Sequence, residues 1–175
     1  MKKVFFALSA LALTSTSVFA ADAGDGTIKF TGEIVDAACV VSPDSQKQEV
    51  VLGQVNKSVF TATGDKSPAT PFKIKLENCD ISSTAKNVEI SFSGVGAAGN
   101  EALVSVSTEP GAATGVGIGI YDNTNTLVDL NTGKSATLLK DGQTVLYFTA
   151  NYVSISDVVT TGYGNAEVDF NLTYN

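Results

Sequence analysis

Hydrophobic and polar residues alternate with a period of two along much of this chain. The alternation is clearest in five runs, at 72–76, 88–92, 116–120, 146–152 and 168–174. A period of two is typical of strands with one buried face, whereas an amphipathic helix repeats every 3.6 residues. Weaker strand candidates follow the same pattern at 33–42, 49–55, 102–108, 126–130 and 135–139. The pattern therefore predicts an all-β sandwich in one domain.

Polar turn residues separate these runs. Lys-Asp-Gly at 140–142 lies between two of them and predicts a hairpin, and 122–125 and 131–133 are further turn candidates. The glycines at 94–99 match GxGxxG, but a dinucleotide site needs a helix that starts there inside a βαβ unit. A β-type run follows instead, so we interpret 94–99 as a connection between strands.

The first residues read as a processing signal. Lys2 and Lys3 precede a short apolar run at 4–13, and a small residue, Ala20, ends the segment. This pattern predicts that 1–20 is a secretory signal, cleaved after Ala20. No apolar run is long enough to cross a bilayer, so we expect export of the chain without direct membrane insertion.

Export changes the reading of the two cysteines, Cys39 and Cys79. In an exported chain a single pair of cysteines most often forms one disulfide, with two buried thiols as the alternative. Closing a loop of this length stabilises a fold by about 4 kcal/mol in the chain-entropy model.

Charge and composition exclude several kinds of function. The 11 basic and 18 acidic residues give a net charge of −7, which argues against a nucleic-acid partner. The chain has no histidine, which excludes Ser-His-Asp and Cys-His catalytic sites and metal sites built on histidine. A carboxylate-only hydrolase remains open, although tryptophan, the usual platform for a sugar ring, is absent too. We expect no enzyme, no metal and no cofactor.

The two ends of the chain are the most informative segments. Alternation at the C-terminus continues to the penultimate residue, and a terminal strand this apolar must be paired and covered. Near the N-terminus Gly26, Ile28, Phe30 and Gly32 share one face of a short strand pattern. This segment could be the first strand of its own sheet or a free extension, which soluble monomers avoid. The pattern leaves both readings open.

Several short motifs occur in an order that resembles a known family. They are the segment 26–34, Ala-Ala-Cys at 37–39, Val-Leu-Gly-Gln-Val at 51–55, the segment 72–79, Gly162 as the fourteenth residue from the end, and penultimate Tyr174. Together they resemble the pilin subunits of chaperone–usher fimbriae, closest to the type 1 fimbrial major subunit family. The resemblance covers essentially the whole chain after the signal.

The resemblance implies an incomplete immunoglobulin-like sandwich, which lacks its last strand, at 33–175, and an N-terminal donor-strand extension at 21–32. The residues that would enter a neighbour's groove are Gly26, Ile28, Phe30 and Gly32. The residues that would line this chain's own groove and meet a chaperone are Gly162, Val168, Phe170, Leu172 and Tyr174, with the Asn175 carboxylate anchored in the chaperone cleft.

The implied function is that of a structural subunit that polymerises by donor-strand exchange, a form of β-strand addition. The expected partners are other copies or related pilins, a periplasmic chaperone and an outer-membrane usher. The product is an adhesive filament on the bacterial surface, with this chain as its main rod subunit. A minor or adaptor pilin is one alternative. A secreted monomeric module whose N-terminal strand pairs within its own sheet is another.

Overall fold

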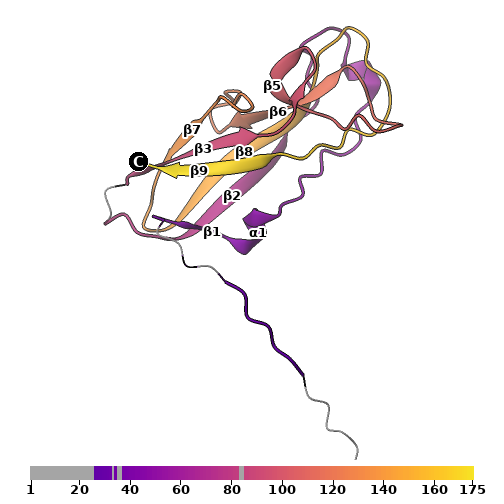
Figure 1. The fold of residues 1–175 in the computed structure, drawn as a ribbon. Coiled ribbons are helices and arrows are strands. Elements are labelled where there is room, and N and C mark those ends of the chain that lie inside the picture. The colour runs from indigo at the N-terminus through magenta and orange to yellow at the C-terminus, as the bar shows by residue number, and fades with distance from the viewer. Residues whose placement is uncertain (1–25, 33, 35–36, 83–84) are drawn as a thin grey trace, which may run out of the picture. The chain divides into compact units, whose positions relative to one another are not determined.

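A computed structural model describes residues 26–32, 34, 37–82 and 85–175. The predicted signal, 1–20, lies outside them, as do residues 21–25 of the predicted extension. The chain divides between residues 35 and 36 into two units, and every strand among the described residues belongs to the second unit (Figure 1). In the first unit, 26–32 and 34 adopt neither a helix nor a strand.

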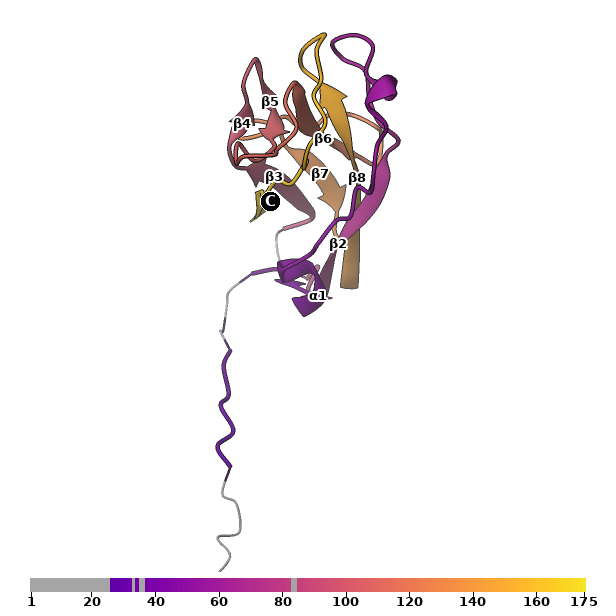
Figure 2. The ribbon, with the colours of Figure 1, turned by 90° about the vertical axis from the view of Figure 1, so that its right-hand side faces the viewer.

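The second unit is a sandwich of two antiparallel sheets (Figures 1 and 2). The larger sheet has the order β1-β2-β8-β6-β5-β4 and the smaller one the order β7-β3-β9. The strands are β1 (Val40–Val41), β2 (Thr70–Cys79), β3 (Asn87–Ser93), β4 (Gly96–Ala97), β5 (Asn100–Ser105), β6 (Val116–Asp122), β7 (Ser135–Leu138), β8 (Gly142–Ser154) and β9 (Asp169–Tyr174). A short helix, α1 (Pro43–Gln46), and a 3-10 turn, η1 (Lys57–Val59), precede β2. These findings confirm the predicted all-β class, and among the described residues no helix has the length and apolarity to span a bilayer.

The core lies between the sheets and is filled by every second residue of the long strands. Ile74 and Leu76 of β2 face Val88, Ile90 and Phe92 of β3, and all five are buried. Aromatic rings join the two layers, because Phe92 meets Phe148 of β8 edge-on with 5.3 Å between ring centroids. Each such side chain contributes about 1.5–3 kcal/mol by leaving water. All five clear alternating runs are strands, so that prediction is confirmed.

The weaker strand candidates fare unevenly. Strands β5 and β7 confirm most of 102–108 and 135–139. Within the described part of the run at 33–42, only the two residues of β1 form a strand. The run at 126–130 makes one isolated bridge, between Leu127 and Tyr121. The run at 49–55 joins no sheet, although its side chains alternate as predicted, with Val50 and Leu52 half-buried and Val51 exposed. It has the pattern of a strand, but no strand of the described part of the chain pairs with it.

The hairpin predicted at 140–142 is wrong. β7 pairs with β3 in the smaller sheet, and β8 pairs with β2 in the larger one, so the turn carries the chain from one layer to the other. The turn itself is tight: Gly142 has a positive φ of 74°, and the Lys140 N–H donates to Thr144 Oγ1 at 2.9 Å. A short glycine turn has the same local sequence whether the two flanking strands pair with each other or enter different sheets. Here the core contacts of β8 determine that it joins the larger sheet.

Two other interpretations of turn residues hold. Asp122 ends β6, and its carboxylate accepts the N–H groups of Thr124 and Thr126 at 2.9 and 3.0 Å, which forms the predicted turn at 122–125. The glycine-rich segment 94–99 connects β3 to β5, as we interpreted it, and it contains the short strand β4, which pairs with β5.

The predicted disulfide is present. Cys39 and Cys79 are bonded and both are buried. The bond joins the residue before β1 to the last residue of β2, and the Asp80 N–H donates to the Ala38 carbonyl at 2.8 Å beside it. The start of the sandwich is therefore tied both covalently and by the backbone to the end of β2.

Replacing both cysteines (Cys39→Ala with Cys79→Ala) should lower the free energy of unfolding by about 4 kcal/mol, because the unfolded chain regains the entropy of the open loop. Urea unfolding followed by circular dichroism measures this loss. The wild-type protein with its disulfide reduced is the matched control and should unfold at a similar urea concentration. A double variant as stable as the oxidised wild type would show that the bond is dispensable.

Candidate functional site

The last strand, β9, has a free edge. It pairs with β3 on one side, and among the described residues no strand pairs with its other side (Figure 1). Asn87 and Asn175 exchange both backbone hydrogen bonds, at 2.8 and 3.0 Å. Bonded and non-bonded pairs alternate along an antiparallel ladder, so the backbone groups of Phe170, Leu172 and Tyr174 point away from β3. These groups can accept another strand.

The same three residues turn their side chains into the sandwich. Phe170, Leu172 and Tyr174 are half-buried and pack against the main core, together with Val168 just before the strand. The inward residues of β3, the neighbouring strand, are by contrast fully buried. The inward face of β9 is therefore a core face that lacks its cover on one side. Its free backbone edge and this half-covered apolar face together form what we call the β9 slot.

The end of β9 is held firmly. The Tyr174 hydroxyl donates to the Cys39 carbonyl at 3.1 Å, and burial raises the pKa of Tyr174, which keeps this donor protonated. A terminal oxygen of Asn175 accepts the N–H groups of Lys86 and Asn87, both at 2.8 Å. The expectation that the terminal strand is paired is therefore met up to its last residue.

An ion pair joins Lys134 to Glu89 of β3, the strand next to β9. Lys134 Nζ contacts Glu89 Oε2 at 2.9 Å on β3. The hydrogen bond from Lys134 lowers the pKa of Glu89, and Asn175 adds to the effect. Glu89 is thus ionised near the C-terminus, and its negative charge is paired with the positive charge of Lys134.

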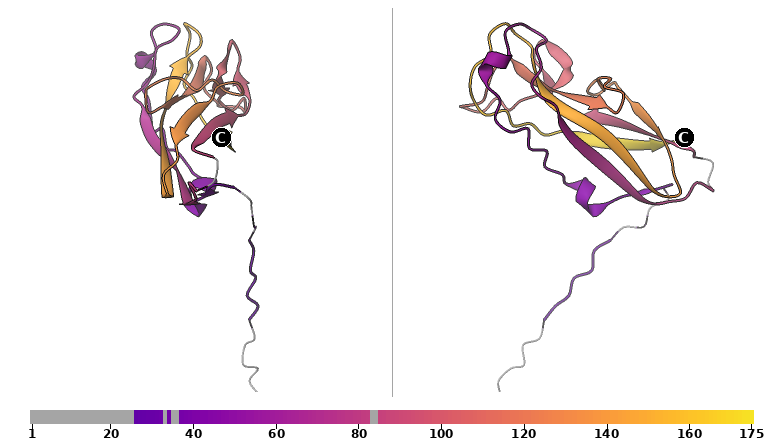
Figure 3. Two further views of the ribbon diagram at one scale, coloured as in Figure 1. Left: turned by 90° about the vertical axis from the view of Figure 1, so that its left-hand side faces the viewer. Right: turned by 180° about the vertical axis from the view of Figure 1, so that it is seen from behind.

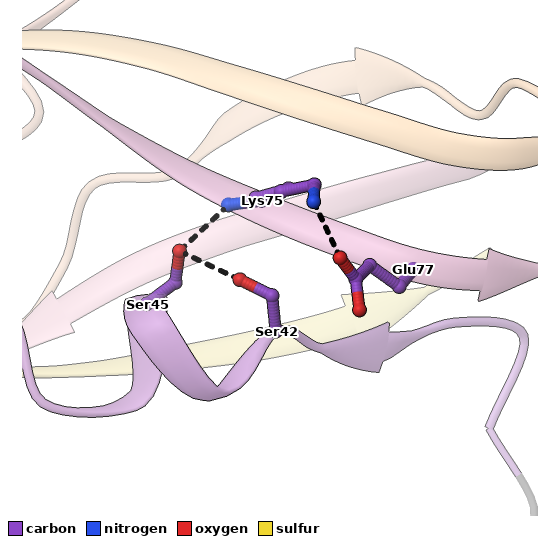
Figure 4. Close-up of polar contacts among 4 residues, drawn as sticks. All are labelled: Ser42, Ser45, Lys75 and Glu77. Carbon is purple, nitrogen blue, oxygen red and sulfur yellow. Dashed lines mark hydrogen bonds and ion pairs between the residues drawn. The ribbon is translucent and has the colours of Figure 1, made fainter.

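The segment that carries Cys39 is fixed to β2 by two serines (Figure 4). The Ser42 N–H donates to the Lys75 carbonyl at 2.9 Å, and Ser45 Oγ accepts the Lys75 N–H at 3.0 Å. Ser42 Oγ also donates to Ser45 Oγ at 3.2 Å, and Lys75 pairs with Glu77 at the surface. This anchoring holds the Cys39 carbonyl where the Tyr174 hydroxyl reaches it.

Sequence analysis treated residues 49–55 as a weaker strand candidate and gave them no part in the functional site. Residues 48–55 run as an extended strip from α1 towards η1 (Figure 3), and no backbone hydrogen bond is made by them among the described residues. Val50 and Leu52 are nonetheless half-buried. The strand-like alternation at 49–55 was the available signal, and it marks a second segment with free backbone groups.

Gly162 lies outside β9, in the segment that leads to it. A Cβ at this position would stand 2.4 Å from the backbone of both Ala112 and Ala113. The Ala113 N–H donates to the Tyr163 carbonyl at 2.9 Å next to it. Close approach of two backbones therefore explains why glycine stands here, and a role in binding a partner remains a prediction.

The predicted donor residues belong to the first unit. The side chains of Ile28 and Phe30 are 76% and 89% exposed. Apart from the adjacent residues of the chain, no described atom lies within 4 Å of the place where a Cβ would stand on Gly26 or Gly32. Two bulky apolar side chains, two residues apart, are thus open to solvent and available to a partner.

Comparisons with known proteins agree with this geometry. The sequence model of the fimbrial protein family matches residues 28–175. Long polar fimbria protein A of Salmonella typhimurium (strain LT2) is 72% identical over 174 residues, which covers 99% of this chain and 97% of that protein. A protein of Escherichia coli O157:H7 described as "Probable major fimbrial subunit LpfA" is also 72% identical over 174 residues, with the same coverage.

Solved structures show the same fold. The P pilus rod subunit PapA superposes with a TM-score of 0.68 at 29% identity, covering 79% of this chain and all (100%) of that chain. The structure of a chaperone–usher pilus that concerns rod uncoiling gives a TM-score of 0.74 at 30% identity, covering 89% of this chain and 99% of that one. Fold and family are those of structural pilus subunits and not of enzymes. The chain therefore belongs to the fimbrial protein family and is a structural subunit of surface fimbriae.

Proposed function

We propose that this chain is the major rod subunit of a chaperone–usher fimbria, in which residues 26–32 of one copy enter the β9 slot of another. The observation that carries the proposal is the β9 slot itself, an edge with free backbone groups above a half-covered apolar face. The role of major subunit is supported by the 72% identity to a relative described as a major fimbrial subunit.

The donor pattern fits such a slot. In an extended strand Ile28 and Phe30 point to the same side, as do Phe170 and Leu172 in β9. Each donor side chain that leaves water contributes about 1.5–3 kcal/mol. Every backbone hydrogen bond to the edge of β9 adds about 0.5–1.5 kcal/mol. The flanking Gly26 and Gly32 let the ends of the donor approach the sheet closely.

One donor and one slot on each copy determine the form of the assembly. The contact joins two different surfaces, so it does not close on itself as a two-fold dimer would. Repetition of a contact between unlike surfaces produces an open filament. This is the assembly that a rod subunit requires.

The uncovered slot also calls for protection before assembly. We assign this task to a periplasmic chaperone that lends a strand to β9 and binds the Asn175 carboxylate, followed by exchange at an outer-membrane usher. The predicted secretory signal at 1–20 supports a route through the periplasm. On this route the apolar face of Phe170 and Leu172 is covered at every stage.

A charge on the donor should abolish assembly. Phe30→Asp places a carboxylate where an apolar side chain must be buried, which costs more than the contact supplies. Material sheared from the surface of cells that express this variant, run unheated on an SDS gel, should show no ladder of SDS-resistant polymer. Thr31→Asp introduces the same carboxylate on the opposite face of the donor and should still polymerise. Normal filaments from Phe30→Asp would rule out the donor assignment.

The acceptor side should respond more mildly. Leu172→Ala removes apolar area that the donor would cover, so each subunit contact should lose on the order of 1–2 kcal/mol. Filaments should form, and they should dissociate in SDS at a lower temperature than the wild type. Thr173→Ala changes the exposed face of the same strand and serves as control. Equal dissociation temperatures for the two variants would place the donor elsewhere.

A further inference from the structure

The outward face of the larger sheet gathers lysine side chains around an exposed tyrosine. In β2 and β8 every second residue faces the core, so the residues between them face outward. Lys73 and Lys75 of β2 and Tyr147 of β8 are three of these outward residues. Lys73 pairs in register with Tyr147, which places their Cβ atoms about 5 Å apart. Lys75 lies one outward position further along β2.

Tyr147 is open to solvent although it lies within a long strand. It is 60% exposed, whereas the outward residues on either side of it in β8, Val145 and Thr149, are half-buried. On the side of β8 away from β2 the neighbouring strand β6 stops short of it, because β6 ends at Asp122, opposite Phe148. The tyrosine is therefore accessible to a partner that approaches the sheet from outside.

A third lysine stands on the same face. Lys66 precedes β2, and its Nζ lies 4.3 Å from the ring centroid of Tyr121 in β6. Tyr121 pairs with Thr149, which is the next outward residue of β8 after Tyr147. The cation–π contact holds Lys66 in place over this ring. Lys66 thus joins the lysines of β2 on one side of the sheet.

The strands of this face carry little free negative charge. β8 has no carboxylate, and the single carboxylate of β2, Glu77, pairs with Lys75 (Figure 4). The carboxylate of Asp122, at the end of β6, accepts hydrogen bonds from the turn that follows. Lys66 and Lys73 are exposed and form no ion pair within the part of the chain that the structure describes. Two positive charges therefore stay unneutralised on a chain whose net charge is −7.

A cationic and aromatic sheet face fits an extended acidic sugar chain. Lysine ammonium groups attract sulfate and carboxylate groups, and a tyrosine offers an apolar ring to the C–H side of a sugar and a hydroxyl to its polar groups. An open sheet face cannot enclose one sugar as a cleft does, whereas a sugar chain can lie across several lysines. Repulsion from exposed carboxylates elsewhere on the molecule is screened beyond about 10 Å at 0.1 M salt. The local positive charge therefore decides.

We propose that this face, defined by Lys66, Lys73, Lys75 and Tyr147 and called here the lysine–tyrosine face, binds acidic polysaccharides. β9 belongs to the other sheet, so a donor strand added to its edge leaves the lysine–tyrosine face uncovered. One copy binds weakly because few charges take part. A filament repeats the face along its length, and linked sites raise the overall affinity by about 10²–10⁴. This avidity, but not the face itself, rests on the proposed assembly.

Binding of sheared filaments to immobilised heparin, a sulfated polysaccharide, tests the proposal. The test variant is the full chain with Lys66→Gln and Lys73→Gln, and the matched control carries Lys57→Gln and Lys140→Gln. Each variant removes two charges from exposed side chains, and only the first changes the lysine–tyrosine face. Hyaluronan, whose charges are carboxylates, replaces heparin in a second arm, and double-stranded DNA in a third. An unheated SDS gel reports polymerisation separately.

Wild-type and control filaments should bind heparin, and the test variant should bind about tenfold more weakly because every repeat of the face loses two charges. Binding by the test variant should also depend less on salt concentration. Tyr147→Ala should weaken binding, whereas Tyr147→Phe, which keeps the ring, should retain most of it. Binding to heparin but not hyaluronan would assign sulfate as the recognised group, and binding to both would assign either anion.

Equal loss of heparin binding in the test variant and its control would show that overall charge and not this face attracts the polysaccharide, and would overturn the proposal. Binding of the wild type to neither polysaccharide, or to DNA as tightly as to heparin, would overturn it as well. In these cases polymer in the unheated gel leaves the proposed assembly standing. A wild type without polymer would instead refute the proposed function, and the same comparison on single subunits then tests the face by itself.

Discussion

The free backbone edge of β9 is the constraint on which the rest of this molecule depends. Unpaired N–H and C=O groups on an apolar strand are a liability, since they template pairing with any passing chain. In this chain the edge coincides with a half-covered core face formed by Val168, Phe170, Leu172 and Tyr174. The described residues of the second unit leave this core face half covered. In the assembly that we propose, a strand from another copy completes it.

The surroundings of this edge are correspondingly rigid. The Tyr174 hydroxyl is hydrogen-bonded to the Cys39 carbonyl, and Cys39 is joined to Cys79 by the disulfide. The serines of the α1 region are hydrogen-bonded to the backbone of Lys75 in β2. The terminal oxygen of Asn175 is held by two N–H groups. A preformed edge of this kind spares an incoming strand the entropic cost of ordering its acceptor. The disulfide thus does more than stabilise the fold, because it fixes the end of the slot.

Much of this could be predicted from the sequence, because the governing pattern is local. Alternation with a period of two places Phe170 and Leu172 on one face whatever the rest of the chain does. The turn at 140–142 was wrong because sheet membership is decided by core contacts with residues far away in sequence. The role of Gly162 was hidden for the same reason, since it depends on the backbone at 111–113. The alternation at 26–32 did not by itself distinguish a strand of the chain's own sheet from a donor, and family resemblance suggested the second.

The most direct test of the central claim is residue-resolved amide hydrogen exchange in intact filaments. The amides of Asn171 and Thr173 face β3 and should be protected in any folded copy. The amides of Phe170 and Leu172 face the free edge, and strand exchange predicts that in filaments they exchange as slowly as their two neighbours. Fast exchange at Phe170 and Leu172, beside protected Asn171 and Thr173, would show that the edge stays open and would contradict the account.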